Sequence, residues 1–283
     1  MESTKQKQIL TVDIGGTKVL VATFDQDGAV QDSKKFKTPK EYDAFIAELR
    51  MTIVDMIGPA QPLACSIALP GSINRAEGVA EYFGNLPWEN VAISKDLSDI
   101  LLCPIYLEND AKMAGLAEAD SIKDLYKRVL YITVSTGIGL GLVVNGKIDH
   151  AVQDAGGKAI MVEHSGKIMA WEEFASGKAI VARTGKMASE ITDEHDWYMV
   201  ARNLAIGMID LIVLLSPEVI VIGGGVGTHL PKFHEKLWNG LELYHNKMVK
   251  MPQIRMAAHP EEAVIYGGYL LAQQNISHHD DSE

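Results

Sequence analysis

Two glycine-rich turns, each directly after an apolar run, are the part of this sequence most suited to chemistry. Residues 9–18 read ILTVDIGGTK, and residues 129–141 read VLYITVSTGIGLG. Glycine allows backbone N–H groups to come close to a ligand, and the neighbouring threonines add hydroxyl donors. Phosphate oxygens suit such donors, so the two turns predict a site that holds a polyphosphate from both sides. Asp13 precedes the first turn and could face a metal ion.

The dipeptide Asn109-Asp110 lies at a predicted junction between a strand and a helix. Residues 102–110 read as a strand, and residues 111–119 are strong helix formers, so both side chains would stand at a helix N-terminus. From the local sequence alone, the expected role of Asp110 is a helix N-cap, a position that Asp often fills.

Predicted strands and helices alternate along the chain, which is typical of an α/β protein. A third glycine cluster, VIVIGGGVG at 219–227, again follows a strand and could pack tightly at a helix start or flank a nucleotide. Each half opens with a strand–glycine–strand unit, so we expect two α/β lobes around a cleft. Helices are expected within 40–57 and near 170–183, 197–215, 231–239 and 263–274.

The bulk composition limits the possible partners. A length of 283 residues favours two domains, and a formal net charge of −11 argues against non-specific binding to nucleic acid or to an anionic membrane. The two cysteines, Cys65 and Cys103, argue against a disulfide framework. The N-terminus has no apolar signal region, and no uninterrupted apolar run reaches transmembrane length, so a cytoplasmic location is expected.

Several segments taken together resemble one known family in their order along the chain. They are DIGGTK at 13–18, ALPG and GNLPW within 68–88, ENDAKMAGLAE at 108–118, STGIGLGLVVNGKI at 135–148 and IGGGVG at 222–227. In these segments the chain resembles the ROK family of sugar kinases, over about residues 9–273. The resemblance implies the two-lobed actin-like ATPase (ribonuclease H-like) fold of hexokinases, with a cleft between the lobes. The expected lobes are a small one of residues 1–110, completed by a C-terminal helix at 262–275, and a large one of residues 111–261.

The resemblance also implies roles for individual residues, with ATP and Mg²⁺ as the expected cofactors. Asp110 would be the catalytic base, and Asp13 would act near Mg²⁺, directly or through water. The residues expected to contact the sugar are Gly71, Asn85, Asn109 and Glu172. The residues expected to contact ATP are Asp13, Gly15, Gly16, Thr17 and Lys18 from one lobe and Thr136, Gly137, Gly224 and Gly225 from the other.

One segment departs from the family pattern. The family usually has E-x-G-H after the second phosphate turn, with the Glu on the sugar and the His on both sugar and zinc. In this chain, which reads DAGGKAIMVEH at 154–164, the expected Glu falls on Gly156 or Gly157 and the expected His on Ala159 or Ile160.

The zinc loop that normally follows this motif is also missing, because the segment HSGKIMAWEEF at 164–174 is short and has no cysteine. Zinc is therefore not expected. Glu163 and His164 could substitute for the missing side chains, but a simple surface turn is the preferred interpretation.

Two functions remain open at this point. One is an ATP-dependent kinase, glucokinase-like, that phosphorylates a hexose hydroxyl, with a hexosamine or an N-acylated sugar as a possible acceptor. The other is a non-catalytic or regulatory ROK homologue that binds a sugar or a nucleotide through a degenerate site. Only eight residues precede the first predicted strand, so the ROK repressors, which carry an N-terminal helix-turn-helix domain, are not expected. A homodimer is the family expectation.

Overall fold

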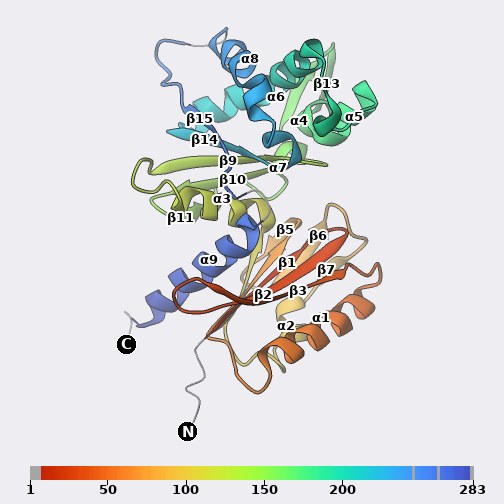
Figure 1. Ribbon diagram of the computed structural model, residues 1–283, viewed down its shortest axis with the longest axis vertical. Helices are drawn as coiled ribbons and strands as arrows, with labels where there is room; N and C mark the ends of the chain where they lie inside the picture. Colours follow the sequence, from red (N-terminus) through yellow and green to blue (C-terminus); the bar gives the residue numbers. More distant parts are fainter. Residues whose placement is uncertain (1–7, 244–245, 260–261, 281–283) are drawn as a thin grey trace. The chain divides into compact units, whose positions relative to one another are not determined.

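The structure, a computed structural model, describes residues 8–243, 246–259 and 262–280 (Figure 1). The chain divides into two compact units: the first is formed by Met1–Ala117 together with Glu262–Glu283, and the second by Glu118–Glu261. The boundary falls inside helix α3 (Asp110–Asp120). Each unit contains a five-stranded sheet and helices, so both are α/β, as the alternating pattern predicts.

Three parallel strands form one half of the sheet in the first unit. The strand order is β3-β2-β1-β4-β8, in which β1 pairs parallel with β4, and β4 parallel with β8. Strands β1, β2 and β3 form an antiparallel meander. The bounds are β1 Ile9–Ile14, β2 Lys18–Phe24, β3 Val30–Lys37, β4 Ala64–Leu69 and β8 Ile105–Asn109. The carboxyl ends of β1, β4 and β8 therefore lie at one edge of this sheet.

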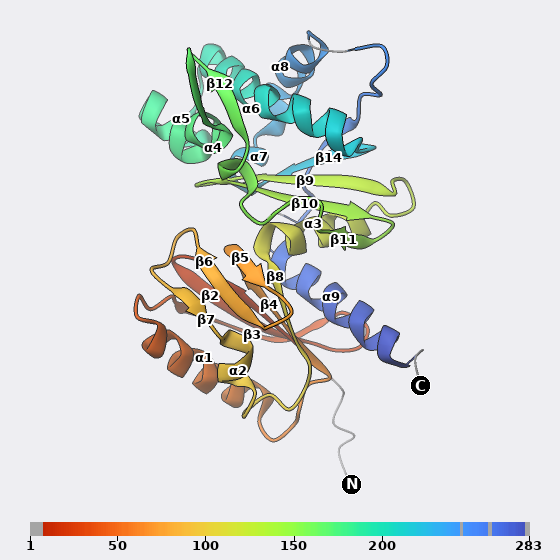
Figure 2. The ribbon, with the colours of Figure 1, turned by 180° about the vertical axis from the view of Figure 1, so that it is seen from behind.

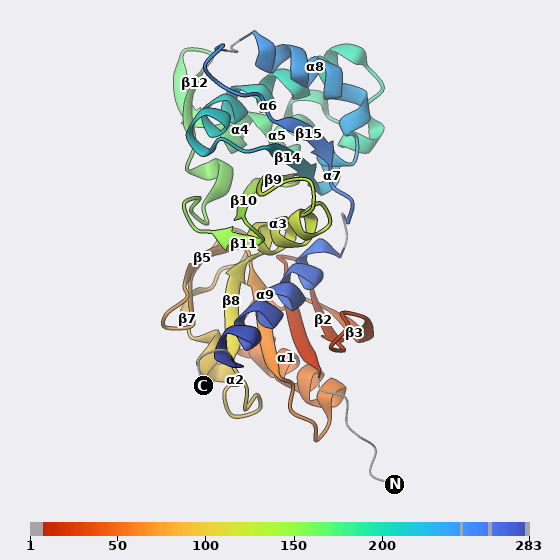
Figure 3. The same ribbon diagram turned by 90° about the vertical axis from the view of Figure 1, so that its left-hand side faces the viewer.

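Helices cover both faces of this sheet (Figures 2 and 3). In β2, the side chains of Val19 and Val21 pack into the core with α1 (Tyr42–Ile57) and α2 (Ile93–Leu97), whereas those of Leu20 and Phe24 pack with α9 (Ala263–Asp280). This alternation explains why β2 is apolar on both sides. A small sheet of β5 (Gly71–Asn74), β6 (Val79–Phe83) and β7 (Glu89–Val91), which the sequence analysis did not predict, follows β4.

The sheet of the second unit has the order β11-β10-β9-β14-β15, with β9, β14 and β15 parallel. Its strands are β9 Arg128–Val134, β10 Ile138–Val144, β11 Lys147–Asp149, β14 Val219–Gly223 and β15 Gln253–Met256. Between β11 and β14 lie the short helix η1 Gly156–Lys158, the hairpin of β12 Met161–His164 and β13 Lys167–Ala170, and the helices α4 Trp171–Ala175, α5 Gly177–Thr184, η2 Ala188–Glu190 and α6 Glu194–Leu215. Helices α7 Gly224–Gly227 and α8 Leu230–Glu242 follow β14.

The helix expected near 170–183 is two helices in the structure. Helix α4 ends before Ser176, which has an extended backbone, and α5 begins directly after it. The side-chain hydroxyl of Ser176 accepts a hydrogen bond from the N–H of Ala179, so Ser176 is the N-cap of α5. A serine at this point favours a new helix start over continuation of the old helix.

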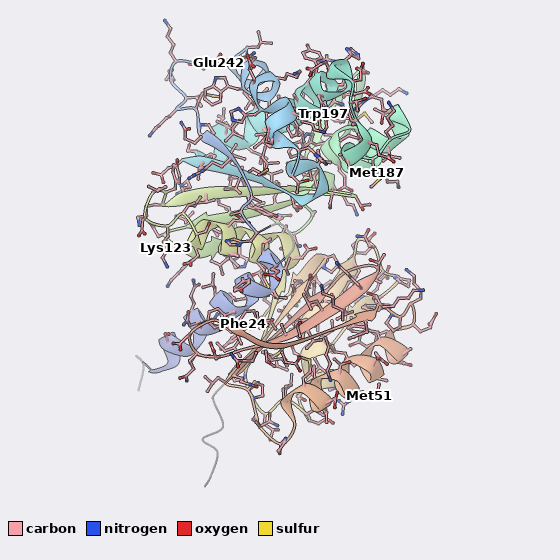
Figure 4. All side chains as sticks on the ribbon, viewed as in Figure 1. Phe24, Met51, Lys123, Met187, Trp197 and Glu242 are labelled. Carbon is pink, nitrogen blue, oxygen red and sulfur yellow. The ribbon has the colours of Figure 1, made fainter. Side chains whose placement is uncertain are left out.

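Helix α6 is the central core helix of the second unit. Trp197, which is labelled in Figure 4, stacks on Phe233 of α8 with 5.5 Å between the ring centroids. The Trp171 indole N–H donates to the backbone oxygen of Asn203 at 3.0 Å. Within the described part of the chain, α6 is the one helix long and apolar enough to cross a membrane. This is weak evidence, because a core helix passes the same test, and half of the apolar stretch of α6 is buried.

The contact between α6 and Trp171 gives a test of this packing. A Cβ at Gly207 would overlap the indole ring of Trp171, whereas a Cβ at Gly240 in α8 would lie 3.5 Å from the Cβ of Ala205 in ordinary contact. We expect Gly207→Ala to lower the free energy of unfolding by about 2–3 kcal/mol through overpacking. Gly240→Ala should leave it unchanged or raise it by up to about 1 kcal/mol, because alanine is the better helix former. Urea unfolding of both variants measures the difference, and equal effects would contradict the packing described here.

Candidate active site

The first glycine turn joins β1 to β2 and is fixed by backbone hydrogen bonds. The N–H of Gly15 donates to the oxygen of Lys18 at 3.0 Å, and the hydroxyl of Thr38 donates to the oxygen of Gly15 at 2.7 Å. A Cβ at Gly16 would lie 2.9 Å from the Cβ of Asn85, so the close approach of Asn85 requires glycine there. Thr17, Lys18 and Asn85 are exposed around this turn, where they can meet a ligand.

Asp13 lies one residue before the end of β1, level with Ala68 of β4. Burial, and secondly the negative charge of Asp110, raise the pKa of the Asp13 carboxyl from 3.8 to about 7, although Lys18 acts in the opposite direction. The carboxyl groups of Asp13, at the end of β1, and of Asp110, directly after β8, repel each other and form the acidic centre of this unit; β4 lies between the two strands.

Asn109, and not Asp110, is the N-cap of α3. Its side-chain oxygen accepts the N–H groups of Ala111 at 3.0 Å and of Lys112 at 3.3 Å. Asp110 is the first residue of the helix, is partly buried, and its carboxylate accepts the N–H of Ala111 at 2.7 Å. The capping role expected of Asp110 therefore belongs to Asn109, and the carboxylate of Asp110 is held at the positive end of the helix.

A buried ion pair lies behind this junction, and the sequence analysis missed it. Glu108 is 2 % exposed and accepts hydrogen bonds from Nε and Nη2 of Arg75, and also from the backbone N–H of Asn109 at 2.7 Å. Arg75 further donates to the oxygen of Ile73 at 3.3 Å. A buried carboxylate needs such partners. The pair connects the small sheet to the end of β8, so it fixes the backbone from which Asn109 and Asp110 project.

Gly71 occupies a backbone conformation that only glycine adopts readily. Its φ is +145°, and a Cβ would overlap the backbone oxygen of Tyr82 in β6. The side-chain amide of Asn109 lies 3.4 Å from the oxygen of Gly71. The predicted sugar-contacting residues Gly71, Asn85 and Asn109 therefore all belong to the first unit, together with Asp110. The fourth, Glu172, lies in the second unit.

The second glycine turn, Ser135–Gly137, joins β9 to β10 in the second unit. The N–H of Ser135 donates to the oxygen of Gly137 at 2.9 Å, which closes the turn, and Ser135 and Thr136 are exposed. The carboxylate of Glu172 accepts the N–H of Ile138 at 2.8 Å. Gly137 and Glu172 are therefore neighbours, and the carboxylate takes the place that a Cβ of Gly137 would fill.

A cavity of about 510 Å³ opens beside this turn, wholly within the second unit. Its volume is in the range of cavities that bind small ligands. Thr136 and Gly225 were predicted to contact ATP and line it, whereas Gly224, with φ +75°, packs against the end of β9. The lining residues are Ser135, Thr136, Gly177, Lys178, Val181, Met187, Ala188, Ser189, Gly225, Val226, Thr228 and His229. Those from α5, from η2 and from the residues just before α8 were missed because nothing local in the sequence marks them.

The segment that departs from the family pattern packs tightly without its Glu and His. Gly156, with φ +53°, and Gly157 both approach Ile138 so closely that a Cβ at either would clash. Glu163 lies on the β12–β13 hairpin, where its carboxylate accepts the N–H of Gly166 at 2.6 Å, and this is the surface turn that was preferred. Among the described residues, no group of three or more His, Cys, Asp or Glu side chains could hold a metal ion.

The fold and the site together define a two-unit α/β protein with a glycine turn in each unit and an acidic strand end in the first. The ROK family model matches residues 9–275, so the chain belongs to the ROK family, as predicted. The N-acetyl-D-glucosamine kinase of Mannheimia succiniciproducens is 28% identical, over 92% of this chain and 97% of that protein. The glucokinase of Streptomyces coelicolor is 24% identical, over 76% of this chain and 81% of that protein.

A solved structure supports the fold independently. The crystal structure of a ROK family glucokinase from Streptomyces griseus, in complex with glucose and AMPPNP, matches with a TM-score of 0.78. The match covers 94% of this chain and 99% of that chain at 21% sequence identity. The predicted fold class is therefore confirmed.

The raised pKa of Asp13 predicts a pH effect on stability. Between pH 3.8 and about 7 the folded chain keeps a proton that the unfolded chain has released, so the free energy of unfolding falls as the pH rises through this range. Asp13→Asn removes this titration. The free energy of unfolding of the variant, compared with that of the parent chain at the same pH, should therefore increase by roughly 2 kcal/mol as the pH rises from 5 to 8.

The measurement is urea unfolding without nucleotide or divalent cation, with Asp124→Asn, an exposed acid, as the control. If the difference between Asp13→Asn and the parent chain stays flat from pH 5 to 8, the described environment of Asp13 is wrong.

Proposed function

We propose that this chain is an ATP-dependent sugar kinase that transfers a phosphoryl group to a hydroxyl of a hexose or of an N-acetylated hexosamine. The observation that carries the proposal is the carboxylate of Asp110, held at the N-terminus of α3 beside Asp13 and within the unit that holds the first glycine turn. A carboxylate in this position can accept the proton that the sugar hydroxyl loses when its oxygen attacks the γ-phosphorus.

A bound nucleotide requires hydrogen-bond donors for its phosphates and a cavity for its adenosine, and the chain has residues suited to both. The first turn presents Thr17 and Lys18, and the second presents Thr136, as exposed polar groups next to glycine backbone. The cavity of the second unit has the size and mixed lining expected for the adenosine part of ATP. Phosphoryl transfer depends mainly on positioning and on neutralisation of charge, so fixed turns suit it.

The residues present also fit Mg²⁺. This ion usually keeps several waters and takes only one or two carboxylates together with the phosphates of its substrate. Asp13 would hold it, and the repulsion between Asp13 and Asp110 would be relieved by a cation between or near them. When bound, Mg²⁺ supplies positive charge to the phosphate oxygens. Asp13 must then be ionised, whereas Asp110 keeps the task of accepting the sugar proton.

The names of the relatives favour catalysis over the non-catalytic alternative. The two relatives described above are named as kinases of N-acetyl-D-glucosamine and of glucose. Because these two names differ in the sugar, we propose a hexose and an N-acetylated hexosamine as the two candidate classes of acceptor. Turnover assays with glucose, N-acetylglucosamine and N-acetylmannosamine would decide between them.

Removal of the proposed base should stop turnover. Asp110→Asn keeps an oxygen that can accept the N–H of Ala111 but has no basic carboxylate, so we expect kcat to fall by about 10²–10⁴. Binding of ADP should be retained, because the base would act on the sugar. A coupled assay of ADP release and calorimetry with ADP measure these two quantities.

The control for this experiment is Asp120→Asn, at the other end of α3, where the carboxylate pairs with the surface residue Lys123 at 3.0 Å. This variant should turn over normally. If no sugar supports turnover in the parent chain although ADP binds, the non-catalytic alternative replaces the kinase.

The adenosine pocket can be tested without disturbing the core. A Cβ at Gly225 meets nothing within 4 Å, and Gly225 lines the cavity. We expect Gly225→Val to raise the KM for ATP about tenfold with little change in kcat. The added side chain should weaken the binding of adenosine equally in the ground state and in the transition state. Ala182→Val, an exposed position of α5 outside the cavity lining, is the control. An unchanged KM for ATP in Gly225→Val would place the nucleotide elsewhere.

A further inference from the structure

Glu172 is bound to the second glycine turn through its carboxylate. Its Oε2 accepts the N–H of Ile138 at 2.8 Å, and the side chain of Glu172 is 19% exposed. A Cβ at Gly137 would overlap this carboxylate, so the turn and Glu172 can be this close only because residue 137 is glycine. One oxygen of Glu172 is therefore committed to the backbone of the turn.

The corner between α4 and α5 holds the same turn at a second point. The N–H of Gly177 donates to the oxygen of Ser135 at 2.7 Å, and a Cβ at Gly177 would overlap that oxygen. Ile138 and Ser135 lie on the two sides of Thr136 and Gly137. The turn is thus held at both ends by residues only five positions apart, which fixes the direction of the N–H groups between them.

The glycines at 156 and 157 complete this arrangement. A Cβ at Gly157 would lie 2.7 Å from the Cβ of Ile138 and 3.4 Å from the Cβ of Glu172, so η1 packs directly on both. The next residue, Lys158, brings its Nζ to 4.0 Å from the second carboxylate oxygen of Glu172. A carboxylate beside a phosphate-binding turn would repel the phosphates, and the ammonium group of Lys158 partly offsets this charge.

We propose that Glu172 is a positioning residue of the phosphate turn, which acts on nucleotide binding through the backbone of Thr136–Ile138. The proposal rests on the proposed kinase function and deepens it, because it assigns Glu172 to the nucleotide. Loss of the carboxylate leaves the Ile138 N–H without its acceptor and frees the turn, so nucleotide affinity falls.

The experiment compares Glu172→Ala, Glu172→Gln and Glu173→Ala. Glu173 is the matched control, because its carboxylate accepts the N–H of Ala170 at 3.0 Å at the start of the same helix and does not touch the turn. We expect Glu172→Ala to weaken ADP binding and to raise the KM for ATP at least about tenfold, as expected for loss of a hydrogen bond to a charged group. Glu172→Gln keeps an acceptor oxygen and should recover most of that loss, and Glu173→Ala should match the parent chain in both quantities.

The outcomes separate this inference from the proposed function. A rise in the KM for the sugar, with ADP binding and the KM for ATP unchanged, would overturn the inference and make Glu172 a sugar contact. The same holds if Glu173→Ala weakens ADP binding as much as Glu172→Ala, because the effect would then come from the stability of α4. A parent chain that binds no ADP would overturn the kinase itself. If Glu172→Ala does not fold, Glu172→Asp, which retracts the carboxylate by one methylene, gives the same comparison.

Discussion

The parallel alignment of β1, β4 and β8 is the constraint on which the acidic site depends. Asp13 lies level with Ala68, and Ala68 lies level with Glu108, so the ends of three strands bring their following residues to one edge. Asp110 follows β8 directly, and this places two carboxyl groups close enough for each to oppose ionisation of the other. Burial, and secondly the charge of Asp110, raise the pKa of the Asp13 carboxyl to about 7.

In the second unit the comparable constraint is the close approach of backbones around the end of β9. A Cβ at Gly177 would overlap the oxygen of Ser135, and a Cβ at Gly224 would lie 2.5 Å from the oxygen of Val134. The carboxylate of Glu172 occupies the space that a Cβ of Gly137 would fill. Two segments far apart in the sequence, residues 172–177 and Gly224, thus meet one short stretch of chain, and only glycine permits each approach. The result is a turn fixed by packing rather than by its own sequence.

The sequence predicts those parts of the site whose signal is local. A predicted strand followed directly by glycines identifies each of the two turns. A predicted strand followed by Asn-Asp and then by a helix identifies residues 109–110. Each signal lies within a few consecutive residues. The sequence does not decide which of Asn109 and Asp110 caps α3, because the two differ by one position and either side chain can cap a helix. The structure decides this through the two N–H groups that Asn109 accepts.

Other parts of the site depend on contacts between distant residues and were not predictable. Arg75 and Glu108 are 33 positions apart, and neither lies in a pattern that indicates the other. The same is true of Glu172 and Ile138, 34 positions apart, for which the family resemblance implied a different partner. The residues of η2 enter the cavity only through the fold of α5 and α6 around them. Order along the chain therefore identified the family, whereas the partner of each side chain required the structure.

The Arg75–Glu108 pair shows why the acidic edge can function at all. Glu108 is the third carboxylate at this edge, and without a partner it would add a further negative charge beside Asp13 and Asp110. The guanidinium of Arg75 and the N–H of Asn109 both bind the Glu108 carboxylate, so its negative charge is neutralised where it stands. The buried pair therefore serves the chemistry through electrostatics as well as through the geometry of the strand end.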